Sequence, residues 1–348
     1  MHMADALLSP GTGVLTWVAS CAVMSVAARR VQQRADDRLL PLMGMLGAFV
    51  FAAQMVNFSI PGTGSSGHLG GGLLLAILLG PHAAFVVVAS VLTVQALFFA
   101  DGGLLALGAN MFNLGVLPCY LAYPLVYRPL AGRSPSPRHA TFAAVLAAVF
   151  ALQLGALAVV LQTVASGIAS LPAAAFLGLM LPIHLAIGVV EGLATAALLG
   201  FLRRARPELL DLAAPAGVPG RRVLPAPLIL AAALTGGVLS WFASTQPDGL
   251  EWSVARVAGT AQPAAPTSDL HAVLHVVQQR LAWLPGYTLS VAAAPEPAPE
   301  HPAAAAWPEV NAVTTLAGLV GGTVTFALVM LVGLGLRRRR ARHRAVPP

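Results

Sequence analysis

The chain has 348 residues, of which 57% are hydrophobic and only 9% are charged. Soluble domains are typically about one quarter charged. Several stretches here run for about 18 residues or more without a charge, which is long enough to cross a bilayer as a helix. The composition excludes a soluble globular domain, a disordered chain and a nucleic-acid-binding protein, and it predicts an all-α polytopic membrane protein.

The net charge of +7 describes topology and not an affinity for nucleic acid. All 20 basic residues are arginine, and most of them gather in four short segments between or after apolar runs. These segments are Arg29 to Arg38, Arg128 to Arg138, Arg203 to Arg222 and Arg337 to Arg344. Because arginine-rich segments stay on the cytoplasmic side of a membrane, they predict which ends of the apolar runs face the cytoplasm.

Nine apolar segments are predicted to form the membrane helices. In chain order they are residues 11–28, 39–57, 69–80, 82–99, 104–127, 140–165, 172–200, 226–244 and 310–336. An arginine segment follows the first helix, so we expect the N-terminus outside the cell and the C-terminus in the cytoplasm of a prokaryotic inner membrane. A signal peptide is the alternative for the first helix, but no basic region precedes that stretch.

The block 69–127 must then cross the membrane three times for the arginine segments to agree. Gly80-Pro81 and Asp101-Gly102-Gly103 supply two breaks, because glycine permits sharp turns and proline removes a helix donor. Segment 69–80 is short, and we expect it to be tilted or only partly inserted. The count gives a seven-helix substrate-binding body and a two-helix C-terminal accessory module.

Three parts are predicted along the chain. Residues 1–204 form the transmembrane body, and the Pro- and Gly-rich residues 205–225 form a cytoplasmic linker. Residues 226–348 form the accessory module, whose loop from 245 to about 309 lies outside the cell. That loop contains a low-complexity Pro-rich segment, 292–308, which we do not expect to pack a core.

The first two residues carry a candidate metal site. A free amine on Met1, the amide nitrogen between residues 1 and 2, and Nδ1 of His2 can close two chelate rings in one plane. Such a plane suits Ni²⁺ or Cu²⁺, and Co²⁺ less strictly. One corner stays empty, and His68, in the Gly-rich stretch 61–72 on the same face, is the candidate for it. Asp5 is the candidate carboxylate for orienting an imidazole.

Other polar residues have weaker claims. His184 and Glu191 lie seven residues apart on one helix face, where interhelical hydrogen bonding is favoured over ligation. His271 and His275 could bind a metal if helical, but an amphipathic surface helix is the favoured alternative. A packed or interfacial histidine is favoured for His82, and a transient relay ligand is the alternative.

Four motifs of residues 1–202 resemble the substrate-specific membrane component of energy-coupling-factor transporters for nickel and cobalt, the CbiM/NikM family. They are MHMADALLSP, GTGSSGHLGGGLLLAILLGP (62–81), ADGGLLALGANMFNLGV (100–116) and HLAIGVVEGLAT (184–195). QPDGLEWS (246–253), LPGY (284–287) and LAGLVGGTVTF (316–326) resemble the small CbiN/NikN-like accessory component, the PDGLE domain. Within PDGLE, Asp248 and Glu251 could collect cations, and a helix start explains them almost as well.

The resemblance implies a transport subunit and not an enzyme. It implies that Met1, His2 and His68 hold the transported Ni²⁺ or Co²⁺, with no prosthetic group. It also implies a separate transmembrane coupling subunit and ABC ATPase subunits as partners, in agreement with the absence of a G-x-x-x-x-G-K-[ST] phosphate loop. The rival functions are a secondary divalent-cation transporter or channel and a membrane metalloenzyme.

Overall fold

The computed structural model describes residues 1–34, 38–132, 136–205, 226–260, 268–289 and 307–345, and confirms the all-α polytopic fold class. The helices of the body are α1 (Pro10–Arg34), α2 (Leu39–Gln54), α3 (Gly72–Leu79), α4 (Pro81–Phe98), α5 (Leu107–Met111), the π-type helix η2 (Phe112–Tyr127), α6 (Arg128–Ala131), α7 (Pro137–Ser166) and α8 (Ala173–Ala205), preceded by the short η1 (Asp5–Leu7). The accessory module contains α9 (Ala226–Gly237), η5 (Leu239–Phe242), α10 (Gly249–Ala258), α11 (Asp269–Leu281), η6 (Pro285–Tyr287) and α12 (Ala312–Ala345). Apart from Ala205, the predicted linker lies outside the described residues, as does most of the Pro-rich segment.

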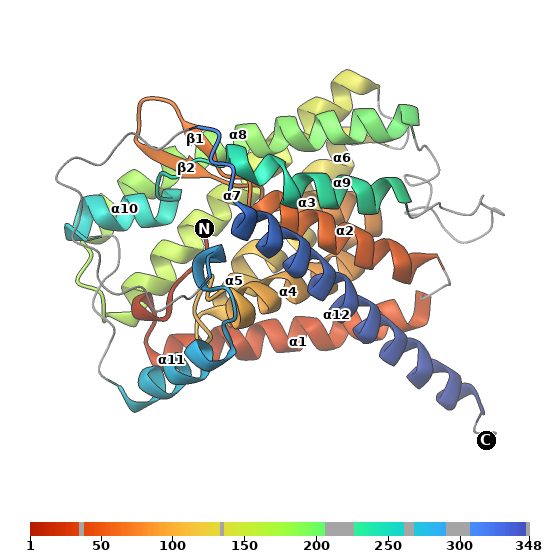
Figure 1. Ribbon diagram of the computed structural model, residues 1–348, viewed down its shortest axis with the longest axis horizontal. Coiled ribbons are helices and arrows are strands. Elements are labelled where there is room, and N and C mark those ends of the chain that lie inside the picture. The colour runs from red at the N-terminus through yellow and green to blue at the C-terminus, as the bar shows by residue number, and fades with distance from the viewer. Residues whose placement is uncertain (35–37, 133–135, 206–225, 261–267, 290–306, 346–348) are drawn as a thin grey trace.

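The two ends of the bundle differ in character. The N-terminus, α10, α11 and a small hairpin gather at one end, at the left of Figure 1. The C-terminal ends of α1, α8 and α12 lie at the other end, where their arginines follow. The helix ends that carry arginine therefore lie at the same end of the bundle, as the order of helices predicted from the arginine segments requires.

Within the described parts of the chain, five helices are long and apolar enough to cross a membrane: α1, α4, α7, α8 and α12. The apolar helix α2 and the continuous segment Pro227–Phe242 are shorter. With eight residues, α3 is about 12 Å long and does not cross on its own. The residues just before α3, 68–71, are non-helical and mostly buried, and Gln54 of α2 and Glu191 of α8 bond to their main chain.

Local chemistry explains the breaks. Gly80 adopts φ of +78° between α3 and α4, and Pro81 begins α4, where its missing N–H costs nothing. The segment around Asp101 turns through Gly102, whose φ is +81°. Both breaks were predicted, whereas the antiparallel hairpin of β1 (Phe58–Ile60) and β2 (Ser65–Gly67) was expected only as a loop.

Small residues bring α7 and α8 close together. A Cβ on Gly192 would lie 2.4 Å from the Cα of Val145, and one on Gly188 would lie 2.9 Å from the Cα of Val149. Such close backbone approach is typical of membrane helix pairs. It fixes the face of α8 that carries His184 and Glu191, both of which are buried.

The accessory module packs directly on the body. Its α12 lies against α2 and α9, and the Cα atoms of α9 and α12 approach closely at Gly236 and Gly318. Its loop carries α10 and α11, which cover the end of the body that holds the N-terminus (Figure 1). The sequence pattern indicated an amphipathic helix for α11, and it indicated only a helix start for α10.

Candidate metal site

The N-terminal segment is threaded into the bundle. Met3, Leu7 and Leu8 are fully or almost fully buried. Asn110 on α5 grips the main chain of Met3: its Oδ1 accepts from the Met3 N–H at 2.8 Å, and its Nδ2 donates to the Met3 carbonyl at 3.1 Å. The Gly103 N–H donates to the same carbonyl at 3.0 Å. These bonds place residues 1 and 2 in the interior.

The loop that carries His68 is anchored from α8 and α2. The N–H groups of Gly70 and Gly71 donate to the Glu191 carboxylate at 3.0 and 3.1 Å. The Gln54 amide donates to the Gly70 carbonyl at 2.9 Å. A buried carboxylate is costly unless it is hydrogen-bonded, and these N–H groups supply the partners. Glu191 therefore positions the His68 loop.

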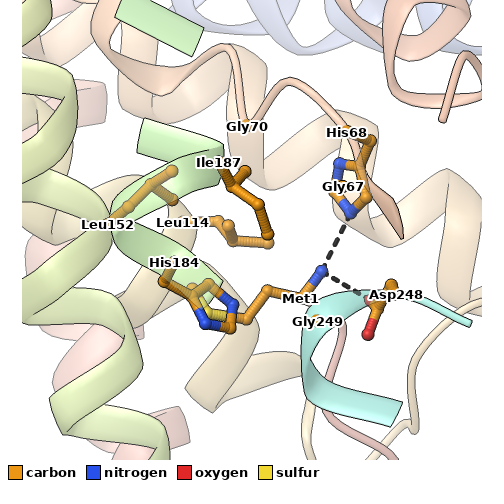
Figure 2. A pocket seen from close by; sticks show the side chains of 10 residues that line it. All are labelled: Met1, Gly67, His68, Gly70, Leu114, Leu152, His184, Ile187, Asp248 and Gly249. Carbon is orange, nitrogen blue, oxygen red and sulfur yellow. Dashed lines mark hydrogen bonds and ion pairs between the residues drawn. The ribbon is translucent and has the colours of Figure 1, made fainter. Parts of the chain in front are cut away.

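The Met1 amine lies between His68 and Asp248 (Figure 2). It is 2.9 Å from His68 Nε2 and 2.8 Å from Asp248 Oδ2. His68 Nδ1 lies 3.2 Å from the Leu69 carbonyl, and donation there leaves a lone pair on Nε2. A backbone carbonyl on the other ring nitrogen is the usual way in which a metal-binding histidine is oriented.

His2 lies in the same site, but its Nδ1 faces a carboxylate and not the Met1 amine. Its ring stacks on that of His68, with the ring centroids 5.1 Å apart and the planes 8° from parallel. Its Nδ1, however, lies 3.2 Å from Asp101 Oδ1. Tyr287 of the accessory module donates its hydroxyl to the other oxygen of Asp101 at 2.5 Å. Chelation through Nδ1 therefore requires the His2 imidazole to turn away from Asp101.

Burial disfavours the charged form of a base and lowers the pKa of both His2 and His68. The Met1 ammonium adds to this effect at His68, whereas Asp101 opposes it at His2. Burial alone would raise the pKa of Asp248, but the adjacent ammonium and its hydrogen bond outweigh burial and hold that pKa below its usual range. Burial therefore favours the uncharged form of both imidazoles, and the adjacent ammonium favours the ionised form of Asp248.

A cavity adjoins the amine. Its walls are formed by Met1, Gly67, His68, Gly70, Leu114, Leu152, His184, Ile187, Asp248 and Gly249. Among the residues that the structure describes, no three side chains of His, Cys, Asp or Glu converge closely enough to hold an ion. In this arrangement side chains alone do not form a metal site, and the Met1 amine is the main-chain donor that lies beside them.

The remaining candidates separate. The Asp5 carboxylate accepts from the Ala106 N–H at 2.8 Å, so it braces the 100–106 loop and does not touch an imidazole. His82 Nδ1 lies 2.9 Å from the Tyr120 hydroxyl, and His82 does not line the cavity. His184 lines the cavity from α8.

His271 and His275 also serve different purposes. His271 is buried and its Nε2 contacts the Leu8 carbonyl at 2.9 Å, whereas exposed His275 pairs with Gln279. The pair therefore belongs to a partly buried amphipathic helix and does not form a joint ligand set.

Two carboxylates escaped sequence reasoning as partners of the site. The sequence pointed to Asp101 only as part of the break Asp101-Gly102-Gly103, and to Asp248 only as a cation collector or part of a helix start. Asp248 does cap α10: its Oδ1 accepts from the N–H groups of Leu250 and Glu251. No local signal places its second oxygen on an amine 247 residues away in the chain.

These observations define the class of protein: a multi-helix membrane protein with an amine and two imidazoles enclosed at one end of its bundle. The family model CbiM, described as cobalt uptake substrate-specific transmembrane region, matches residues 2–209. The model of the PDGLE domain matches residues 222–338. The chain belongs to the family of cobalt uptake substrate-specific transmembrane regions and carries a PDGLE domain on the same polypeptide, which confirms the predicted resemblance.

Curated relatives agree. The chain is 35% identical over 212 residues to a putative metal transport protein of Haloquadratum walsbyi, covering 60% of this chain and 93% of the relative. It is 35% identical over 231 residues to the putative fused nickel transport protein NikMN of Archaeoglobus fulgidus, covering 64% and 72%. It is 33% identical over 225 residues to the fused nickel transport protein NikMN of Rhodobacter capsulatus, covering 60% and 64%.

Proposed function

We propose that this chain is the substrate-binding membrane subunit of an energy-coupling-factor importer, which captures Ni²⁺ or Co²⁺ outside the cell and delivers it inward. The observation that carries the proposal is the 2.9 Å separation of the Met1 amine from His68 Nε2, with His2 stacked beside them. The names of the fused relatives support nickel, and the family description supports cobalt.

The capture chemistry follows from the donor atoms. The Met1 amine, the His2 amide nitrogen and His2 Nδ1 supply three corners of a plane, and His68 Nε2 supplies the fourth. An all-nitrogen plane selects against Ca²⁺ and Mg²⁺, which prefer oxygen ligands. Binding requires the amine and the amide to lose protons. Release requires His68 to leave the plane, since losing one corner weakens the site.

Energy for transport comes from other subunits in this proposal. The sequence contains no lysine, and so no lysine-containing phosphate loop. We therefore assign ATP hydrolysis to partner ABC ATPases, coupled through a separate transmembrane subunit. The protein would lie in a prokaryotic cell membrane, with the N-terminal end of the bundle outside and the arginine-rich end in the cytoplasm.

The rival functions find less support. A secondary transporter or channel requires ionisable groups that relay a charge, and Glu191 is instead engaged with the N–H groups of Gly70 and Gly71. The accessory module contacts the ligands directly through Asp248. That contact is better suited to a capture site than to a catalytic centre.

The test is Ni²⁺ and Co²⁺ binding to the purified full chain, with the native N-terminus and with one extra alanine before Met1. The extension keeps every side chain but moves the amine and shifts His2 to the third position. We expect tight binding to be lost, or its spectrum to change and its dependence on His68 to disappear. Binding that is unchanged by both the extension and His68→Ala overturns the proposal. The relative affinities of the parent rank the two ions.

A further inference from the structure

Of the accessory-module side chains that the structure describes, Asp248 is the one hydrogen-bonded to the Met1 amine, and it is held there firmly. Its Oδ1 is committed to capping α10, while its Oδ2 faces the amine. The turn before it is bonded to the His68 hairpin. The Ser66 N–H donates to the Pro247 carbonyl at 2.8 Å, and the Ser66 hydroxyl donates to the Gln246 carbonyl at 2.7 Å. Asp248 and His68 are therefore fixed relative to each other.

The distances around the amine match those between neighbouring ligands of one metal ion. Two donors about 2.0–2.1 Å from an ion and at right angles to each other lie about 2.9 Å apart. The Met1 nitrogen is 2.9 Å from His68 Nε2 and 2.8 Å from Asp248 Oδ2. Protons of the ammonium group now bridge these atoms. A cation that replaced them would find the amine at a suitable spacing from each of the two other donors before His2 moved.

His184 presents a further donor to the same cavity. It is 1% exposed, and its Nδ1 lies 2.7 Å from the Met180 carbonyl, so donation there leaves the lone pair on Nε2. That Nε2 is buried and has no hydrogen-bond partner among the described residues. His68 is oriented in the same way, through Nδ1 and a backbone carbonyl. A Cβ on Gly249, the neighbour of Asp248, would lie 3.3 Å from the His184 ring, so glycine leaves the ring room.

We propose that this cavity is a loading site, distinct from the all-nitrogen plane and used before it. In the loading complex a divalent transition-metal ion is first held by the Met1 amine, His68 Nε2 and Asp248 Oδ2, and the His184 ring then moves in from the cavity wall to supply Nε2 as the fourth donor. The His2 amide and Nδ1 then displace Asp248 and His184. This order spares the first step from deprotonating an amide and from turning His2 away from Asp101. The inference rests on the proposed function.

The experiment is stopped-flow Ni²⁺ binding to the purified full chain, with the end-point absorption spectrum recorded for every variant. Asp248→Asn keeps the shape and the helix cap but weakens the ligand, and Asp248→Ser is a second cap-competent variant in case the first does not fold. Glu251→Gln is the matched control, because it removes a negative charge in the same module one turn away. His184→Asn keeps a donor for the Met180 carbonyl and removes Nε2, and exposed His275→Asn is its control.

We expect Asp248→Asn to slow association by about tenfold or more, with His184→Asn slowing it several-fold and both controls close to the parent. Association of Asp248→Asn at the parent rate overturns the loading site. Equal slowing by Glu251→Gln also overturns it, because Asp248 would then act only through the general attraction of a negative charge for the cation. An unaffected rate in His184→Asn removes the fourth donor and overturns the complex as stated. Failure of the proposed function gives a different result: the alanine extension and His68→Ala then leave the end-point spectrum the same as that of the parent.

Discussion

His68 is buried, His2 is partly buried and the two rings are stacked, but the polar contacts of the two imidazoles differ. His68 already presents Nε2 to the Met1 amine, and its other nitrogen is satisfied by a carbonyl of its own loop. His2 has the nitrogen needed for chelation turned to Asp101. One imidazole is ready to bind and the other is restrained.

The difference follows from how each residue is held. The His68 loop is fixed by rigid helices through Glu191 and Gln54. His2 belongs to a terminal segment whose main chain is gripped one residue later, at Met3, while its ring is held by a loop carboxylate. A preassembled plane would have to admit an ion between four closed ligands. A site with one fixed and one restrained imidazole keeps a path of entry for the ion.

The largest effect is expected from removing the imidazoles themselves. Structural metal sites with four ligands bind with about 10–16 kcal/mol, or roughly 3 kcal/mol per ligand, so His68→Ala should lower equilibrium Ni²⁺ affinity by about a hundredfold. His2→Ala should cost more, about a thousandfold, because it also opens a chelate ring. Competition with a chromogenic chelator measures both, with His275→Ala as the control. Equal, small losses in the two variants would contradict the contrast.

A methyl group added at one glycine beside the N-terminal segment, or at one glycine of the His68 loop, should show how much each segment contributes to Ni²⁺ affinity. A Cβ on Gly103 would lie 2.5 Å from the main-chain nitrogen of Asp5, so Gly103→Ala should expel the N-terminal segment and lower Ni²⁺ affinity by about a hundredfold. A Cβ on Gly67 would meet the Ile187 side chain at 2.6 Å, which can rotate, so Gly67→Ala should cost only about tenfold. Isothermal titration provides the affinities.

Gly178→Ala is the control for both substitutions, because nothing lies within 4 Å of its added Cβ. Binding of Gly103→Ala with parent affinity would mean that the threaded N-terminal segment is not needed for the site. That result would contradict the view that the N-terminal segment holds His2 for metal binding.

Loosening the His68 loop should have an intermediate effect. In Glu191→Gln one of the two backbone N–H groups now bonded to the carboxylate faces an amide NH₂ group, and charge-assisted bonds worth about 1.5–3 kcal/mol are weakened. We expect Ni²⁺ affinity to fall by about thirtyfold through greater mobility of His68. Exposed Glu309→Gln is the control. A thermal shift without any change in affinity would show that Glu191 supports only the fold.

The sequence predicted those parts of the molecule that depend on local chemistry. Charge-free runs predicted the helices, and Gly80-Pro81 predicted the break between α3 and α4, because a positive φ and a helix start favour those residues there. The meeting of Met1, His2 and His68 was predicted from covalent geometry and family resemblance. The structure brings them together, and their role as metal ligands stays a prediction.

What the sequence did not predict depends on contacts between distant segments. Asp248 and Tyr287 reach the site only because the accessory module packs onto the body, and no residue pattern near either one specifies the amine or Asp101 as its partner. Asp5 was expected to orient an imidazole because it is close in sequence. In the structure η1 turns it toward the Ala106 N–H, and Asp101 lies beside His2 instead.

The smallest effect is expected at Asn110, which acts on His2 only through the neighbouring residue. Asn110→Leu keeps the volume but leaves the buried N–H of Met3 unpaired, while the Met3 carbonyl still accepts from Gly103. An unpaired buried donor costs about 1–3 kcal/mol, part of which will appear as fraying of the N-terminal segment, so Ni²⁺ affinity should fall by about tenfold or less.

Asn311→Leu is the control for this substitution. It removes an asparagine–backbone bond of the same kind at the start of α12 and should leave affinity unchanged. Because the Asn110 side chain bonds to Met3 and the His68 loop is bonded to Gln54 and Glu191, the residual binding of Asn110→Leu should still depend fully on His68, and a double variant with His68→Ala should show additive losses in free energy. Strong coupling in that double variant would mean that the two imidazoles are held as one unit.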